Sequence, residues 1–387
     1  MRRVLVVDDE QSVLDGLKKA LRAYRQQFQI DTAHGGVAAL EKLREQRYDA
    51  VISDARMPEV DGEQVLLTVR ECQPLAARLI LSGQVDRGSN LRLAGLAHQF
   101  LAKPCEAADV VKALEHCCGT LEGIGDPHVR TLATQLSFLP MRAEPHQKLT
   151  KLMQTSNANV EEVAAIIEAS TPFGTSILRV ASSPLFGASR INSVADAARL
   201  LGLEVLREML KLMMVGEIQL PPGLMNAIRL RAHVRVVLAR KLAAHAGVRW
   251  AVDGVVLQDV GLSVRLLYQS SWAHAWLEEA GDDAAQLLEL ERRDSEYLPL
   301  GVSLLTLWRV PAPLLAALIP SSLEEVQPKE ARALVGLALK LERASRPARA
   351  ETEMQLAREY AERAGFAELW PELWCVACEL QKSSFPL

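Results

Sequence analysis

Short runs of apolar residues alternate with longer segments of helical spacing along residues 1–118. The apolar runs predict strands at Val4–Val7, Gln29–Ala33, Ala50–Ser53, Arg78–Leu81 and a last one that ends at Phe100-Leu101. The other segments predict helices at Val13–Tyr24, Val37–Arg44, Glu63–Cys72, Arg87–Gly95 and Glu106–Cys118. Short apolar strands that alternate with helices indicate an α/β domain over residues 1–118, with a doubly wound, five-stranded parallel sheet covered on both faces.

The pattern changes near Gly119. Residues 119–129 hold three glycines and an Asp-Pro pair, which predict a linker. Beyond this point strand alternation stops, and the apolar stretches have helical spacing. We therefore expect an all-α domain over residues 130–325 and a C-terminal helical extension over residues 326–387, which closes the same bundle or extends from it.

Composition limits the function classes. The chain has 387 residues, 49% of them apolar, so two or three domains with buried cores are expected. Its 44 basic and 48 acidic residues give a net charge of −4, which leaves no basic excess for a DNA backbone. No apolar run reaches the ~20 residues of a membrane span, and the N-terminus lacks the apolar stretch of a signal peptide. The six cysteines are few for this length and no export signal is seen, so we expect free thiols and a cytoplasmic location. The charge balance and the lack of a long apolar run predict no contact with DNA or membrane.

Polar residues with a common chemistry follow the expected strands. Asp8, Asp9, Asp54, Ser82 and Lys103 all fall at strand carboxyl ends, where sites of doubly wound sheets lie. A cluster of carboxylates with room for water suits Mg²⁺. Phosphoryl transfer to a carboxylate needs a nucleophilic aspartate, a divalent cation, a hydroxyl and a fixed cation on the phosphoryl oxygens. These residues would supply all of them except the metal.

Residues 1–118 resemble the flavodoxin-like receiver (CheY-like) domain of bacterial two-component response regulators. The matching stretches are Val4–Glu10, Asp54–Gly62, Leu81–Gly83 and Phe100–Pro104. The resemblance implies that Asp54 is the phosphoacceptor. It also implies that Asp54, Asp9 and Asp8 bind Mg²⁺, with the backbone carbonyl of Arg56 completing the metal shell.

The same resemblance implies a conformational switch. Ser82 would move onto the phosphoryl group and the ring of Phe100 would follow, while Lys103 contacts the phosphoryl oxygens. The Lys103-Pro104 bond is often cis in the family. A receiver that folds but is never phosphorylated remains the alternative.

The helical half carries a different motif, a hydrophobic segment that bears the polar pair Gln258-Asp259. Metal phosphohydrolases of the HD superfamily have His-Asp at the matching position, and a glutamine amide is a poor ligand for a transition metal. His233 is the one candidate for the family's upstream histidine. One carboxylate and one imidazole are too few for a catalytic metal site.

Residues 130–325 therefore resemble the HDOD domain, an HD-related output domain without catalytic ligands. The matching stretches are Leu136–Pro140, Val163–Ile167, Ile177–Gly187 and Ile191–Gly202. A nearby basic run is interpreted as a solvated face, because acidic stretches lie elsewhere in this half. Its members are Arg229, Arg231, Arg235, Arg240 and Lys241.

Together these features predict a phosphoprotein of a two-component phosphorelay. A sensor histidine kinase would phosphorylate Asp54 and so alter the receiver face built from the fourth helix, fifth strand and fifth helix. This face either packs on the helical domain or forms a homodimer, and phosphorylation would either release or clamp the helical domain. The helical domain would bind or release a downstream signalling protein, and no enzyme activity is expected beyond receiver autophosphorylation and autodephosphorylation. The alternatives are a divergent HD-GYP-like cyclic di-GMP phosphodiesterase under receiver control and a DNA-binding output domain.

Overall fold

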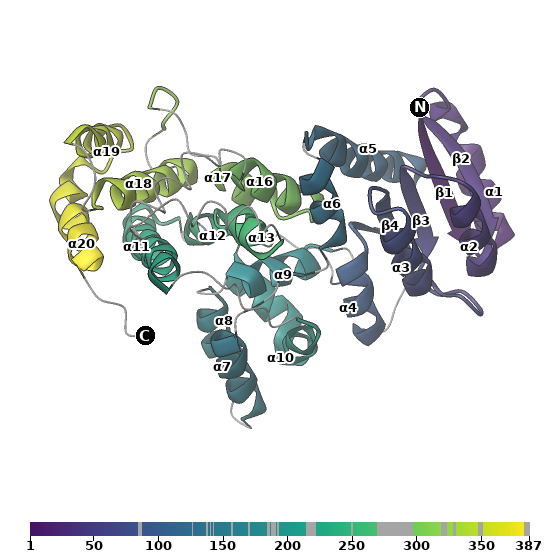
Figure 1. Cartoon of the computed structure of the whole chain (residues 1–387), viewed down its shortest axis with the longest axis horizontal. Coiled ribbons are helices and arrows are strands. Elements are labelled where there is room, and N and C mark those ends of the chain that lie inside the picture. Colours follow the sequence, from purple (N-terminus) through teal and green to yellow (C-terminus); the bar gives the residue numbers. More distant parts are fainter. Residues whose placement is uncertain are drawn as a thin grey trace.

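The computed structural model describes most of the chain. The described part comprises residues 1–83, 87–125, 127–136, 138–139, 141, 143–155, 158–168, 171–183, 186, 191, 193–213, 222–248, 251–268, 297–318, 323–327, 330–346 and 351–382. A sheet with its flanking helices lies at one end of the molecule and the last three helices lie at the other (Figure 1).

The N-terminal domain is built on a parallel sheet of five strands in the order β2-β1-β3-β4-β5. The strands are β1 (Arg2–Asp8), β2 (Phe28–His34), β3 (Ala50–Asp54), β4 (Ala77–Ser82) and β5 (Gln99–Ala102). The α/β prediction is confirmed, and the apolar runs predicted the strands to within a few residues.

Five helices cover the sheet, and alternate side chains of each strand face opposite layers. They are α1 (Gln11–Ala20), α2 (Gly35–Glu45), α3 (Gly62–Cys72), α4 (Arg87–Leu96) and α5 (Ala107–Gly123), with a short 3₁₀ turn at Leu21–Tyr24 after α1. Val4 and Val6 of β1 join the core under α1 and α5, whereas Leu5 and Val7 join the core under α2 and α3. The strand ends thereby stay open for a site.

The expected linker is mostly helical. Helix α5 continues through Gly119 to Gly123, and the next helix, α6 (Pro127–Gln135), begins at the proline of the Asp-Pro pair. Proline is well tolerated in the first turn of a helix, because the N–H it lacks has no intrahelical partner there. The chain leaves helical structure at Ile124 and Gly125 only briefly, so the two domains are closely joined.

The second domain is helical wherever the structure describes regular elements, as predicted. After α6 come α7 (Ala143–Gln154), α8 (Val160–Glu168), α9 (Thr171–Ala181), α10 (Val194–Leu212), α11 (Pro222–Ala246), α12 (Ala251–Leu257), α13 (Val260–Tyr268), α16 (Tyr297–Leu307) and α17 (Ala312–Leu318). The Ser193 hydroxyl caps α10 by accepting from the Asp196 N–H, 3.0 Å away. A kink divides α10 at Gly202, whose φ of 73° lies in the left-handed region that glycine tolerates.

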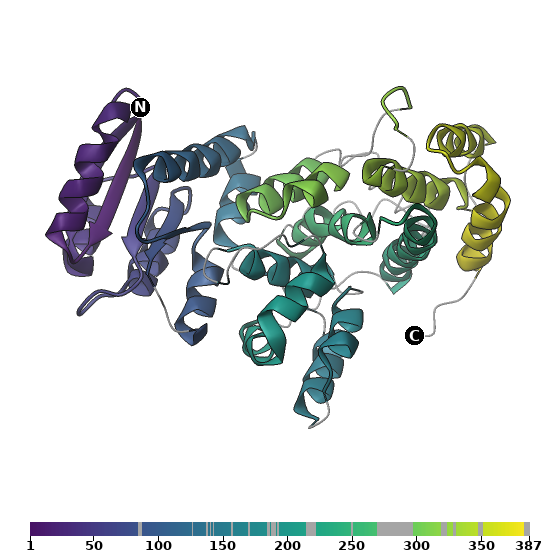
Figure 2. The same ribbon diagram turned by 180° about the vertical axis from the view of Figure 1, so that it is seen from behind.

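The C-terminal extension forms α18 (Ala331–Ala344), α19 (Glu351–Arg363), a short 3₁₀ turn (Ala367–Leu369) and α20 (Trp370–Lys382). Together with α11, these helices enclose a hydrophobic core of their own. From behind, α18 lies between the rest of the helical domain and the pair α19–α20 (Figure 2). The extension therefore both extends the bundle and shares α11 with it.

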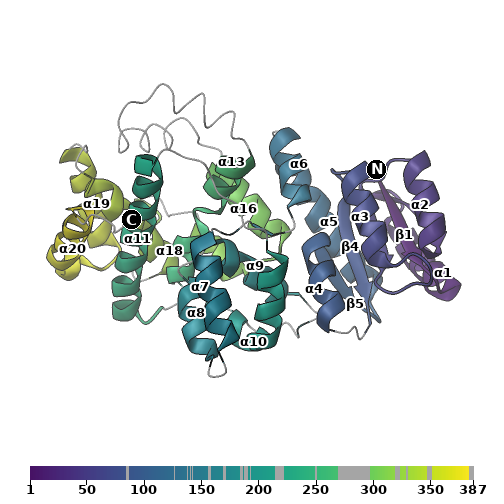
Figure 3. The same ribbon diagram turned by 60° about the horizontal axis from the view of Figure 1, so that its bottom comes forward.

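The two domains pack directly on one another. Helix α4 lies against α9 and α10, and α5 lies against α16 (Figure 3). The His116 imidazole of α5 donates from Nε2 to the Thr306 carbonyl of α16 at 2.9 Å. One continuous hydrophobic cluster contains Phe100 of the sheet and Trp308 just after α16. Of the two arrangements expected for the α4–β5–α5 face, the structure shows packing on the helical domain.

Among the described helices, none has the combination of length and apolar character that crossing a bilayer requires.

Candidate functional site

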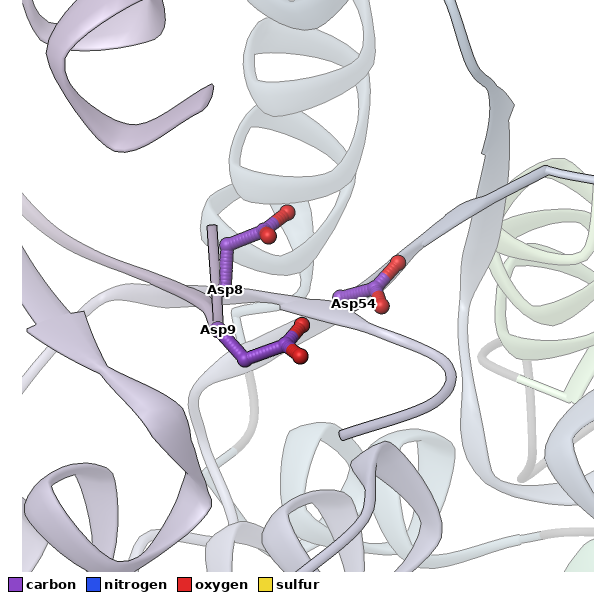
Figure 4. Close-up of side chains that lie close together, drawn as sticks. All are labelled: Asp8, Asp9 and Asp54. Carbon is purple, nitrogen blue, oxygen red and sulfur yellow. The ribbon is translucent and has the colours of Figure 1, made fainter. Parts of the chain in front are cut away.

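Three carboxylates meet at the carboxyl edge of the sheet. Asp8 ends β1 and Asp54 ends β3, and these strands are neighbours because Val7 pairs with Ser53. Each of Asp8, Asp9 and Asp54 offers a carboxylate oxygen, and these oxygens lie within 4.8 Å of one another. Figure 4 shows the side chains of Asp8 and Asp9 directed toward the side on which Asp54 lies. The sequence prediction that these three residues converge is thereby matched by the geometry.

Lys103, which follows the edge strand β5, offsets part of this negative charge. The ammonium of Lys103 donates to Asp54 Oδ1 at 2.6 Å and to Asp8 Oδ2 at 2.8 Å. Its position follows from β5, because the Lys103 backbone N–H donates to the Ser82 carbonyl at 2.7 Å. The next peptide bond, Lys103–Pro104, is cis. The pocket thus holds a fixed cation beside the aspartate that the sequence singles out.

Burial and hydrogen bonding act in opposite directions on the pKa values of Asp54 and Lys103. Burial raises the pKa of the Asp54 carboxyl, although the hydrogen bond from Lys103 acts in the opposite direction. Burial also lowers the pKa of the Lys103 ammonium, but its hydrogen bonds to Asp54 and Asp8 outweigh this effect and raise the pKa overall. Lys103 therefore stays charged, and a second positive charge would stabilise the charged forms of the three carboxylates.

Ser82 and Phe100 occupy the adjacent strands β4 and β5. Ser82 is buried at the end of β4, where its hydroxyl donates to the Gly83 carbonyl at 3.1 Å. Phe100 is buried within the hydrophobic cluster that spans both domains. Ile80 and Ser82 of β4 pair with Phe100 and Ala102 of β5. A movement of Ser82 at the end of β4 would therefore take place directly beside β5.

One glycine of the Asp54–Gly62 stretch, to which the sequence analysis gave no role, lies directly against the backbone of Asp54. Gly62 begins α3, and its N–H donates to the Ala55 carbonyl at 3.2 Å. A Cβ at this position would lie 2.2 Å from the Asp54 carbonyl oxygen. The Asp61-Gly62 sequence, an N-cap followed by a glycine, is the signal that could have identified this role.

The predicted residues of the helical domain are arranged differently. Asp259 lies between α12 and α13 and is 8% exposed, and the Arg231 guanidinium of α11 donates directly to its Oδ1. Arg235 lies 3.6 Å from the same oxygen. His233 is exposed on another face of α11, and the amide of Gln258 donates to the Leu318 carbonyl at 3.2 Å. Asp259 is therefore partnered by guanidinium groups rather than by His233.

The interpretation of the basic run as a solvated face is wrong for two of its members. Arg231 and Arg235 are each only 1% exposed. They are four residues apart and so share one face of α11, and that face turns toward Asp259 and α18. Sequence charge alone could not show this, because the acidic partners are distant along the chain.

Comparison with known proteins agrees with both halves of the chain. A family model of the response regulator receiver domain matches residues 4–115, and a model of the HDOD domain matches residues 139–320. The chain is a receiver domain joined to an HDOD domain. Its architecture supports a role as a response regulator, and receiver domains are phosphorylated by histidine kinases.

The curated relatives match only part of this chain. The transcriptional regulatory protein PrrA of Mycobacterium leprae is 37% identical over 112 residues, which cover 28% of this chain and 46% of that protein. The protein-glutamate methylesterase/protein-glutamine glutaminase 3 of Burkholderia thailandensis is 33% identical over 153 residues, 38% of this chain and 42% of that protein. The chain thus spans less than half the length of these relatives. The crystal structure of the MmoQ response regulator from Methylococcus capsulatus is 23% identical, covers 61% of this chain and 98% of that one, and has a TM-score of 0.48.

Proposed function

We propose that this chain is a phosphorylation-gated response regulator whose receiver domain accepts a phosphoryl group on Asp54 from a sensor histidine kinase. The observation that carries the proposal is the pocket itself, in which Asp54 lies with Asp8, Asp9 and Lys103 at the open edge of the sheet. All donors of the carboxylate cluster are oxygens, which suits Mg²⁺. Asp8, Asp9, Asp54 and the Arg56 carbonyl would hold the ion, and when bound it would neutralise charge on the phosphoryl oxygens.

The chain's own residues have distinct parts in the transfer. A carboxylate oxygen of Asp54 attacks the phosphorus atom, and the bond from phosphorus to the donor breaks. Lys103, now bonded to Asp54 and Asp8, would move its contact to the transferred phosphoryl oxygens. Ser82 follows Leu81, the β4 residue that pairs with Asp54, so its hydroxyl would donate to the same group. Phe100 would then adjust in β5, next to the helical domain.

The HDOD domain is proposed to bind a downstream signalling protein rather than to catalyse a reaction. Gln258-Asp259 occupies the place of the His-Asp pair of HD phosphohydrolases, which we call the HD position. There the Arg231 guanidinium donates to Asp259, so a cationic side chain contacts the carboxylate that would otherwise face a metal. Within the described residues, Asp8, Asp9 and Asp54 form the one group whose geometry could hold a metal ion. These features support loss of the HD ligands and disfavour hydrolysis of cyclic di-GMP.

Labelling of the purified full chain by a small phosphodonor tests the receiver proposal. With Mg²⁺ and radiolabelled acetyl phosphate, we expect acid-stable, base-labile label that Asp54→Asn removes and that chelation of Mg²⁺ prevents. Asp15→Asn is the matched control, because Asp15 lies exposed on α1 and does not belong to the carboxylate cluster. Equal labelling of the wild type and the Asp54→Asn variant would refute the assignment of Asp54.

The output proposal needs a separate test. The full chain would be used to capture proteins from host lysate with and without a beryllofluoride phosphoryl mimic, with Asp54→Ala as control. We expect a protein whose recovery changes with the mimic in the wild type but not in the variant. Recovery of no such protein, together with transition-metal ions bound to the helical domain, would favour the phosphodiesterase alternative instead.

A further inference from the structure

An arginine of the HDOD domain reaches into the receiver domain at the corner between α4 and β5. Arg179 of α9 is only 5% exposed, and its Nη2 donates to the Ala97 carbonyl at 2.7 Å and to the Gly95 carbonyl at 3.4 Å. Both carbonyls belong to the end of α4 and the turn that follows it. The positive guanidinium also faces the negative end of the α4 dipole. Helices α4 and α9 lie side by side in Figures 1 and 3.

The receiver supplies a second buried arginine to the same corner. Arg78 of β4 is 1% exposed, and its Nε donates to the Leu96 carbonyl at 2.7 Å. Its Nη2 donates to the Thr134 carbonyl of α6. The backbone N–H of Arg78 donates to Nδ1 of His98 at 3.0 Å, so the last residue before β5 is fixed to β4.

The two guanidinium groups thereby tie three parts of the chain together. Arg179 also donates to the Leu136 carbonyl just after α6, at 3.5 Å, and lies over the Trp308 ring with its Cζ 4.8 Å from the ring centroid. The α4–β5 turn, the end of α6 and helix α9 consequently share one set of hydrogen bonds. We call Arg78 and Arg179 the interdomain arginine pair.

Burial makes this arrangement sensitive to small movements. A guanidinium withdrawn from water is costly unless its N–H groups are bonded, and N–H···O bonds ordinarily span about 2.7–3.2 Å. Among the bonds of Arg179 described above, the one to the Ala97 carbonyl lies within this range. Burial lowers the pKa of both arginines to about 9, which reflects the same cost. A shift of the α4–β5 turn by about one ångström would therefore leave Arg179 poorly bonded while it is still buried.

We propose that Arg179 is the positioning residue through which the HDOD domain senses the α4–β5 turn, and that the docked arrangement opposes phosphorylation. This inference rests on the proposed function. Phe100, two residues after His98, connects the turn to the phosphoacceptor side of the sheet through β4 and β5. A change in β5 on phosphorylation would displace the turn, break the bonds to Arg179 and loosen the docking.

Thermodynamic reciprocity gives a test that does not require the downstream partner. If docking disfavours the phosphorylated receiver, weaker docking must favour phosphorylation by the same factor. In the full chain with Mg²⁺ and acetyl phosphate, we expect Arg179→Ala to raise the fraction phosphorylated at sub-saturating donor about five-fold or more, as typical coupling energies imply. Arg207→Ala is the matched control, since Arg207 donates from Nε to the Met153 carbonyl at 2.8 Å within the HDOD domain, on helix α10.

Hydrogen–deuterium exchange of the α4–β5 segment gives a second readout. The beryllofluoride mimic should speed exchange there in the wild type, whereas Arg179→Ala should show fast exchange already and little further change. Should Arg179→Ala fail to fold, Arg179→Lys would replace it, with a smaller shift in the same direction.

Unchanged phosphorylation and exchange in a folded Arg179 variant would overturn this inference and leave the proposed function intact. An increase of equal size in the Arg207→Ala control would also overturn it. Absence of phosphorylation in the wild-type chain would instead contradict the proposed function on which the inference rests.

Discussion

At the scale of single residues, Lys103 forms hydrogen bonds to two of the three clustered carboxylates. We expect its loss to separate phosphorylation of Asp54 from the change in shape that phosphorylation causes. Lys103→Ala removes the cation that would bind the phosphoryl oxygens but leaves Asp54 as nucleophile. We expect labelling to slow by about 10²-fold, the effect of removing one group that stabilises developing charge. The beryllofluoride mimic should also no longer alter the shape of the chain in X-ray scattering.

The matched control for this prediction is Lys18→Ala, because Lys18 lies exposed on α1. It should leave both the labelling rate and the scattering response unchanged. A Lys103→Ala chain whose shape still responds to the mimic would show that coupling does not depend on this lysine.

His98 gives a residue-scale prediction for pH. Burial, with further effects from Arg78 and Arg179, lowers the pKa of the His98 imidazole well below its ordinary value. The unfolded chain takes up a proton near pH ~6.5 while the folded chain does not, so the folded state loses stability as pH falls below that value. Between pH 7 and pH 5.5 the loss should be about 1 kcal/mol.

The measurement is the denaturant midpoint of the full chain at these two pH values. His98→Asn keeps an acceptor for the Arg78 N–H but removes the titrating ring. We expect its midpoint to fall less than that of the wild type over the same interval. Equal decreases in both proteins would mean that other groups cause the acid sensitivity.

At the scale of elements, Gly62 at the start of α3 packs directly on the backbone of Asp54 at the end of β3. Gly62→Ala would place a methyl carbon 2.2 Å from the Asp54 carbonyl oxygen, so the backbone itself would have to move. We expect a loss of about 2 kcal/mol in the free energy of unfolding and slower labelling of Asp54. Gly119→Ala is the control, since this exposed position in α5 has open space around it and should gain up to about 1 kcal/mol.

Chemical denaturation and acetyl phosphate labelling of both variants would check this pair. A Gly62→Ala protein as stable and as active as the wild type would mean that the loop after β3 relaxes without cost.

Elements whose pattern is local were predictable from sequence, and contacts between distant elements were not. Buried apolar runs and the aspartates directly after them predicted the sheet and brought Asp8 and Asp54 to one edge. Arg179 gave no such signal, because its acceptors are main-chain carbonyls of another domain. A search for metal-ligand residue types pointed to His233 on α11, whereas the face that meets Asp259 carries Arg231 and Arg235. The packing of α11, rather than residue type, decides which side chains reach the site.

For the whole molecule, buried charge connects the HD position to the C-terminal extension. Glu342 of α18 is fully buried, accepts from Arg235 at 3.1 Å and accepts from Arg346 at 2.6 Å. Arg235 in turn lies beside Asp259. The helices that follow the matched HDOD residues are thus linked to Asp259 through Arg235 of α11, which gives this buried charge a structural role.

Glu342→Gln tests that role. It keeps the shape of the side chain but removes the charge between two buried arginines, and breaking a buried pair in this way costs about 3 kcal/mol. We expect a lower denaturant midpoint and faster proteolysis between α18 and α20, with labelling of Asp54 unchanged because the receiver lies at the other end of the molecule (Figure 1). Glu372→Gln is the matched control, since Glu372 pairs with Lys241 at 2.5 Å on the exposed surface between α20 and α11, where water screens the charges and the midpoint should not move. A Glu342→Gln chain that melts like this control would show that the extension is held by its hydrophobic core alone.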